Sequence, residues 1–227
     1  MEVQVIGPSQ DPSILDRQES QRRERIKEAL QWLEQSRAVM ENGHFRFGSR
    51  KHEQHGAVYV NPRRLFNRAY ASKWLANALY DVLPTEIRQQ TEIVGGPPTG
   101  GVIVVRDLSD EISTKRKKNE PEVEGLFFSK DADDVITLHE EDRERVKGRR
   151  ILLVDDVRHR GATFAACAAA IKQYGGIVIA TAELIDRGLP ALELGVPNFY
   201  VAKVRSPRLF YVADCPMCKA GVPITKF

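Results

Sequence analysis

The chain has 227 residues, of which 42% are hydrophobic and 29% charged, a composition typical of a globular domain with a full core. Its net charge of +3 is too small to indicate nucleic-acid binding, and it lacks the run of about 18 apolar residues that a membrane helix requires. Three cysteines, a low and odd number, argue against a disulfide framework, and residues 1–25 contain no signal-peptide core, so we expect a cytoplasmic protein.

The first part of the chain is predicted to contain two amphipathic helices separated by a β-hairpin. Residues 1–17 carry two prolines and no periodicity, and we expect a flexible arm there. Apolar residues recur on one helical face over 18–40 and again over 67–83. Between the two helices, residues 43–61 predict a strand, a turn and a strand. Apolar and polar side chains alternate there, as in Phe45-Arg46-Phe47.

From residue 92 onward, short apolar runs alternate with helical segments, which predicts a parallel sheet flanked by helices. Strands are predicted over 93–94, 125–128, 135–138, 151–154, 177–185 and 198–204. Helices are predicted from Val102, over 164–174 and over 189–195, and a charged connection over 139–149. Residues 113–122 contain no apolar side chain, which indicates an exposed, mobile loop.

Residues 151–163, Ile-Leu-Leu-Val-Asp-Asp-Val-Arg-His-Arg-Gly-Ala-Thr, carry the clearest chemical signal. An apolar strand ends in Asp155 and Asp156, a short loop with Gly161 follows, and an Ala-rich helix begins. This geometry places an anion at a helix N-terminus, where free N–H groups and the positive end of the helix dipole point outward. A plain helix cap is the alternative role of the acids, but the flanking residues favour a phosphate site.

Four separated segments resemble orotate phosphoribosyltransferases of the type I phosphoribosyltransferase family. They are residues 43–52 with Tyr59-Val60-Asn61, residues 92–101, residues 151–163, and residues 183–187 with 194–197. The resemblance implies a type I phosphoribosyltransferase fold over 18–227, a single α/β domain with a central parallel sheet flanked by helices. A small hood, formed by residues 40–61 and the C-terminal tail, would cover the base.

The same resemblance implies an activity and its partners. The enzyme would transfer a phosphoribosyl group from phosphoribosyl pyrophosphate to orotate, giving orotidine 5-phosphate and pyrophosphate, in pyrimidine nucleotide biosynthesis. Family members usually act as homodimers, in which a mobile loop reaches the neighbour's site. Mg2+ would be held mainly by substrate and water, so no protein ligand is assigned to it.

Roles follow for the residues that match the motifs. Asp155 and Asp156 would hold the ribose hydroxyls, because carboxylates accept from two hydroxyl donors. Arg187 would pair with the orotate carboxylate, its alternative being a surface cation. The 5-phosphate would be bound by Arg158, His159, Arg160, Gly161, Ala162 and Thr163. Pyrophosphate would be bound by Gly96, Pro97, Pro98, Thr99 and Gly100, where glycine permits close backbone approach; a generic turn is the alternative.

The polar loop over 113–122 is the segment best placed to close over such a site. Closure would bring Lys115, Lys117 and Lys118 to the leaving group as catalytic cations and would exclude water. A solvated surface with no catalytic role is the alternative.

One stretch departs from the family pattern. Where the family usually has two hydroxyl side chains before the glycine, this chain has Arg158-His159-Arg160. Arg160 can bind phosphate bidentately or can crowd the pocket. Two other functions therefore stay open: a phosphoribosyltransferase for another base, such as a purine, and a non-catalytic nucleotide-sensing regulator with the same fold.

The cysteines near the C-terminus have the spacing of zinc ligands. A structural zinc site requires four ligands, and the sequence offers no second pair beside Cys215 and Cys218. We therefore expect a packed C-terminal turn there. A metal would require a nearby histidine or a site shared between two subunits.

Overall fold

The computed structural model describes residues 12–48, 53–68, 70–131, 135–188, 193–204 and 209–226. At its centre lies a six-stranded sheet in the order β10-β9-β8-β5-β6-β7. The strands are β5 (Ile93–Gly96), β6 (Glu124–Lys130), β7 (Ile136–Leu138), β8 (Arg150–Arg158), β9 (Ile177–Asp186) and β10 (Asn198–Lys203). Five are parallel, and β7 runs antiparallel to β6. The predicted α/β sheet is confirmed, although the prediction of parallel pairing is wrong for β7.

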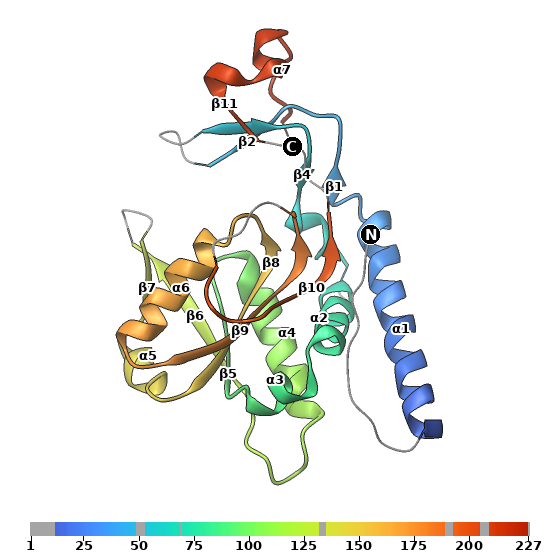
Figure 1. The fold of residues 1–227 in the computed structure, drawn as a ribbon, viewed down its shortest axis with the longest axis vertical. Helices are drawn as coiled ribbons and strands as arrows, with labels where there is room; N and C mark the ends of the chain where they lie inside the picture. Colours follow the sequence, from blue (N-terminus) through green and yellow to red (C-terminus); the bar gives the residue numbers. More distant parts are fainter. Residues whose placement is uncertain are drawn as a thin grey trace.

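Helices cover both faces of this sheet (Figure 1). Leu152 and Val154 of β8 pack toward α1 (Pro12–Gln35), α2 (Ala71–Val82) and α4 (Gly100–Thr114). Ile151 and Leu153 pack toward α6 (Ala162–Gln173) on the other face. Because successive side chains of a strand point to opposite faces, one fully apolar run serves both cores. Three short helices complete the layers: η2 (Pro62–Arg64), α3 (Thr85–Gln90) and α5 (Glu140–Arg145).

Several boundaries differ from the sequence-based expectation. Helix α1 begins at Pro12, inside the expected flexible arm, and ends at Gln35; residues 1–11 lie outside the described residues. Helix α5 occupies part of the expected charged connection. Residues 193–195 of the expected helix over 189–195 are not helical, and its first part lies outside the described residues. Within the described part, no helix combines the length and apolarity needed to cross a membrane.

Small strands stand above the carboxyl edge of the central sheet (Figure 1). β2 (Phe45–Phe47), β3 (Gln54–Gly56) and β11 (Phe210–Tyr211) form a three-stranded antiparallel sheet, and β1 (Val39–Met40) pairs with β4 (Tyr59–Val60). The tail continues through η3 (Val212–Asp214) and α7 (Pro216–Lys219). We call these strands and the tail the hood. The buried apolar cluster of its three-stranded sheet consists of Phe45, Phe47 and Leu209.

Candidate functional site

The site lies at the carboxyl ends of two neighbouring strands, after which the chain continues toward opposite edges of the sheet. β5 and β8 are adjacent and parallel, so their carboxyl ends lie side by side. The chain after β5 enters α4 and returns as β6, whereas the chain after β8 enters α6 and returns as β9. Open α/β sheets bind ligands at this kind of switch point. The turns over 97–99 and 159–161 therefore meet at the expected edge of the sheet.

The two acids connect these turns. β8 continues through Asp155 and Asp156 to Arg158, beyond the expected end at residue 154. Because side chains alternate along the strand, Asp155 enters a cavity on the side of α6, and Asp156 lies on the side of α4. A Cβ atom on Gly100 would lie only 1.7 Å from Asp156 Oδ2. Only glycine at this position lets the pyrophosphate-type turn approach the carboxylate.

Burial raises the pKa values of both acids and of a neighbouring glutamate. Desolvation, with the neighbouring Asp156 charge, raises the pKa of Asp155 well above its ordinary value. Desolvation also raises the pKa of Asp156 to about 6. Directly beside Asp155 in the sheet, burial raises the pKa of Glu183 to about 7, although Asn198 and Arg158 oppose this shift. Raised carboxyl pKa values in a cleft are typical of binding or catalytic sites.

The N-terminus of α6 is shaped to accept an anion. Gly161 adopts a left-handed conformation with φ of 76° immediately before the helix. Ala162 and Thr163 are exposed in the first turn, whose N–H groups have no acceptor within the helix. They line a cavity of about 440 Å³ together with Asp155 and Arg160. The structure thus brings part of the predicted phosphate loop and one acid around one space.

The two arginines of this loop, Arg158 and Arg160, have different surroundings. The Nε atom of Arg158 lies 3.0 Å from Glu183 Oε1, and its Nη2 donates to Asp186 Oδ2 at 3.1 Å. Its guanidinium therefore joins β8 to β9 and is already engaged by two carboxylates. Arg160 is exposed at the cavity. Both arginines line the cavity, and Arg160 is the one whose side chain is exposed there.

Arg187 lies beneath the hood and is fully buried. Its Nη2 donates to the Val58 carbonyl at 2.9 Å, its Nη1 lies 2.7 Å from His159 Nδ1, and its guanidinium sits 4.5 Å from the centre of the Phe47 ring. Burial lowers the pKa of Arg187 to about 10, and desolvation with this cation lowers the pKa of His159 to about 4. His159 is therefore a neutral acceptor here. A base reaching Arg187 has to exchange one of these contacts.

The hood contributes cavity residues for which the sequence predicted no individual role. Arg46 and Phe47 from β2 and Tyr59 from β4 line the cavity. Burial, reinforced by the Asp156 charge, raises the pKa of Tyr59. Alternation along Phe45-Arg46-Phe47 places Arg46 and Phe47 on opposite faces of β2, so it does not predict that both residues line the cavity. A sequence alone does not reveal which face covers the sheet.

The structure does not bring the three predicted lysines to this site. Residues 113 and 114 are the last residues of α4, and the rest of the segment over 113–122 follows this helix at the amino edge of the sheet (Figure 1). Arg116 in this loop donates to the carbonyl of Thr91, just before β5 begins. Lys115 pairs with Glu111 and lies 4.0 Å from the Tyr80 ring. Within one chain, Lys115, Lys117 and Lys118 therefore lie at the end opposite to the acids.

A different lysine occupies the edge where the acids lie. Lys130 is the last residue of β6, next to β5 in the sheet, and is exposed. The order strand, turn, helix, loop, strand was the missed signal. In a parallel unit, the turn after a strand lies at the carboxyl edge, and the loop after the helix lies at the amino edge.

Comparison with known proteins agrees with this geometry. The family model described as phosphoribosyl transferase domain matches residues 70–205, more than half of the chain. The orotate phosphoribosyltransferase of Novosphingobium aromaticivorans is 30% identical over 79% of this chain and 85% of its own length. That of Erythrobacter litoralis is 29% identical over 88% of this chain and 95% of its own length.

The fold agrees as well. The crystal structure of orotate phosphoribosyltransferase from Aeropyrum pernix superposes with a TM-score of 0.57 at 22% identity, covering 77% of this chain and 93% of the other. The match of the family model spans both turns, both acids and Arg187. The chain therefore belongs to the phosphoribosyltransferase family.

Proposed function

We propose that the protein transfers a phosphoribosyl group from phosphoribosyl pyrophosphate to orotate. The observation that carries the proposal is the acid pair, which lies between two turns suited to anions at the switch point of the sheet. A donor with a phosphate at one end and a pyrophosphate at the other matches this order. Curated relatives of nearly the same length are orotate phosphoribosyltransferases, which favours orotate as acceptor.

Each part of the site has a chemical role in this reaction. The N-terminus of α6, with the Thr163 hydroxyl and Arg160, would bind the 5-phosphate. Asp155 and Asp156 would accept hydrogen bonds from the ribose hydroxyls and stabilise positive charge that develops on the sugar. The backbone from Gly96 to Gly100 would hold the pyrophosphate. Catalysis would rest on positioning and on charge stabilisation.

The donor set fits Mg2+. Recessed carboxylate oxygens are hard ligands of the kind that Mg2+ prefers, and Asp155 and Asp156 would hold its water ligands while the substrate supplies the remaining oxygens. Bound Mg2+ would neutralise charge on the departing pyrophosphate.

Arg187 and the hood favour an anionic acceptor. A buried guanidinium next to an aromatic ring suits the carboxylate of orotate, whereas adenine calls for apolar stacking and neutral donors. We expect turnover of orotate and none of adenine, guanine or uracil. The assay follows loss of each base with phosphoribosyl pyrophosphate and Mg2+. Turnover of adenine without orotate would contradict the proposal, and binding of the donor without turnover of any base would favour a regulator.

Substitution of Arg187 separates base recognition from donor binding. In Arg187→Ala we expect kcat/KM for orotate to fall about 100-fold or more, because a charge-assisted carboxylate contact is lost. The dissociation constant for phosphoribosyl pyrophosphate should change by less than about threefold. Steady-state kinetics and calorimetric titration give the two values. An equal loss in both would mean that the residue only supports the fold.

Donor binding should weaken in acid. The raised pKa of Asp156, about 6, means that this carboxyl becomes neutral in the free protein as pH falls through that value, leaving fewer acceptors for the ribose hydroxyls. We expect KM for phosphoribosyl pyrophosphate to rise about tenfold for each unit of pH below about 6. In Asp156→Asn this dependence should disappear. A flat profile in the unmodified protein would contradict the assigned role.

The position of the lysines predicts unequal effects of their removal. Lys130→Ala should lower kcat, because Lys130 lies at the carboxyl edge of the sheet. Lys117→Ala with Lys118→Ala should leave kcat within about twofold, as expected for surface positions remote from the site. Initial rates at saturating substrates decide this. A large loss in the Lys117/Lys118 variant would instead support the alternative that the loop serves a neighbouring chain.

A homodimer is part of this proposal. Trp74 of α2 and Val102 and Ile103 of α4 are large apolar side chains exposed on two helices that pack against each other. Sedimentation equilibrium should give twice the chain mass at assay concentration. A monomer with full activity would refute the dimer without affecting the site.

A further inference from the structure

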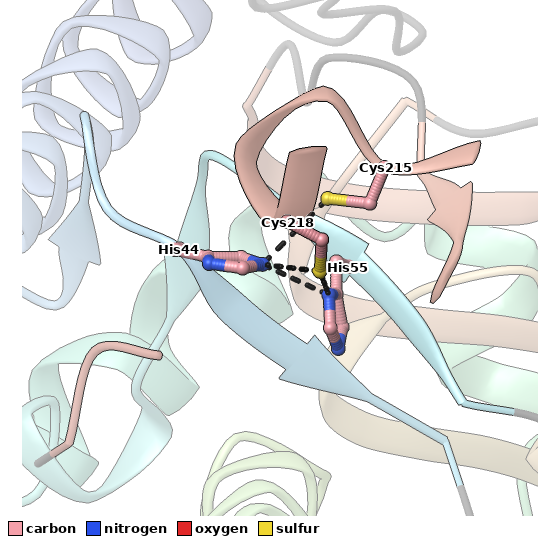
Figure 2. A group of neighbouring side chains, drawn as sticks. All are labelled: His44, His55, Cys215 and Cys218. Carbon is pink, nitrogen blue, oxygen red and sulfur yellow. Dashed lines mark hydrogen bonds between the residues drawn. The ribbon is translucent and has the colours of Figure 1, made fainter. Parts of the chain in front are cut away.

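The hood brings together four side chains that have no part in the proposed reaction. His44 precedes β2, and His55 lies in β3. In the tail, Cys215 directly precedes α7, and Cys218 lies within that helix. Figure 2 shows their side chains pointing toward one another from the hairpin and from the tail. All four ligand atoms lie within 4.8 Å of one another. We propose that these four residues bind a structural zinc ion.

The distances fit a tetrahedral ion. His44 Nε2 lies 2.8 Å from His55 Nδ1, 3.5 Å from Cys218 Sγ and 3.6 Å from Cys215 Sγ, and His55 Nδ1 lies 3.1 Å from Cys218 Sγ. With Zn–N of about 2.0 Å and Zn–S of about 2.3 Å, neighbouring ligand atoms in a tetrahedron are about 3.3–3.8 Å apart. Small side-chain adjustments therefore suffice to admit the ion.

The outer nitrogens of both imidazoles are already held by acceptors. His44 Nδ1–H donates to the Val222 carbonyl at 2.7 Å, and His55 Nε2–H donates to Glu53 Oε1 at 2.8 Å. These contacts place a hydrogen on the outer nitrogen of each ring, so a ring with one hydrogen has its lone pair on the nitrogen that faces the other ring. Two lone pairs at 2.8 Å repel unless a proton or a metal lies between them. Acceptors behind metal-binding histidines are the usual supporting arrangement of zinc sites.

Burial and donor type favour zinc as a structural ion. His44 is 1% exposed, His55 3% and Cys215 0%, and the cysteines are not joined by a disulfide. Two imidazoles and two thiolates are ligands for zinc and not for Mg2+. Four protein ligands leave no open position, so the ion would have no catalytic role.

A zinc ion would stabilise the hood, whose apolar core is small. Among the described residues, the buried apolar cluster of its three-stranded sheet consists of Phe45, Phe47 and Leu209, with Met40 and Tyr59 packed against them, which is a small core for an element of this size. Zinc would join the tail to the hairpin across more than 160 positions of sequence, and would thereby hold Phe47 and Tyr59 over the cavity. The zinc site and the phosphoribosyl site share no residue, so the two proposals fail separately.

Metal analysis of the purified full chain tests the proposal. The protein is purified under reducing conditions without chelator, equilibrated with Zn2+ and desalted. We expect one equivalent of zinc per chain in the unmodified protein and in Cys167→Ser, which replaces a buried cysteine outside the cluster. Cys218→Ser and His55→Ala should retain less than about one tenth of this amount. Full zinc retention in both ligand variants would overturn the proposal.

Spectroscopy on the unmodified protein tests the zinc site even if the ligand variants do not fold. Replacement of zinc by Co2+ should give the intense visible bands of tetrahedral cobalt with a thiolate charge-transfer band. Glu53→Ala should weaken zinc affinity about tenfold through the loss of the acceptor behind His55. Absence of bound metal in the reduced unmodified protein, or a Cys215–Cys218 disulfide in its place, would refute the site.

Discussion

Replacing both acids, Asp155→Asn with Asp156→Asn, should abolish turnover while making the protein more stable. We expect kcat/KM for phosphoribosyl pyrophosphate to fall at least about 100-fold at neutral pH. Neutral amides accept weaker hydrogen bonds from the ribose hydroxyls than carboxylates do, and they cannot stabilise positive charge on the sugar. Steady-state kinetics measures the loss. Calorimetric titration with the donor and Mg2+ should show a parallel loss of affinity.

The gain in stability follows from the raised pKa values. A folded-state pKa of about 6 for Asp156, against an ordinary value of 3.8, means that the folded protein binds this proton more tightly than the unfolded chain does. Ionisation of Asp156 at neutral pH therefore costs about 3 kcal/mol of folding free energy, a cost that an amide avoids. We expect a higher Tm for the variant at neutral pH. The difference should shrink as pH falls below about 6 and vanish below about 4, where the acid is protonated in both states.

The matched control is Asp110→Asn, which changes an exposed acid on α4. It should leave both kcat/KM and Tm unchanged. An acid-pair variant that loses both activity and stability would mean that the carboxylates serve the fold, as a helix cap does, and would remove them from the binding site.

Gly100→Ala should inactivate the enzyme through a purely steric effect. The new Cβ would lie 1.7 Å from Asp156 Oδ2 and 2.4 Å from Asp156 Cγ, so either the turn or the carboxylate has to move. Because the acid and the turn would contact the same donor molecule, we expect kcat/KM to fall about 100-fold or more. Kinetics with phosphoribosyl pyrophosphate as the varied substrate measures this effect.

The control for Gly100→Ala is Gly125→Ala in β6. The atoms nearest to a Cβ atom there would be side-chain atoms of Phe127 and Val105 at 3.2–3.4 Å, which can adjust. This variant should keep kcat/KM within about threefold. A Gly100→Ala enzyme with normal kinetics would show that Asp156 and the turn move apart readily, and that their contact has no part in catalysis.

The sequence predicts the α/β layers and the two turns because both rest on local patterns. Apolar runs such as Ile151 to Val154 fill two cores and identify buried parallel strands. Gly161 before an Ala-rich segment identifies a helix start with a left-handed residue in front of it. The acids follow from their place after such a strand.

The remaining features depend on contacts between distant segments. β8 extends through Arg158 because that side chain meets Glu183 and Asp186 on β9, which the local sequence does not show. Arg187 is buried because the hood covers it, with Val58 as its acceptor. Cys215 lies next to His44 only because the tail packs onto the hairpin. The position of the lysine loop, in contrast, follows from topology, because the loop after the helix of a parallel unit lies at the amino edge of the sheet.

A crystal structure with phosphoribosyl pyrophosphate and Mg2+ would show whether the acid pair holds the donor between the two turns. We expect the 5-phosphate on the N–H groups of Gly161 to Thr163, the ribose between Asp155 and Asp156, and the pyrophosphate on the backbone from Gly96 to Gly100. A donor bound elsewhere, or a turn closed by the Arg160 guanidinium with no phosphate in it, would remove these residues from the donor site.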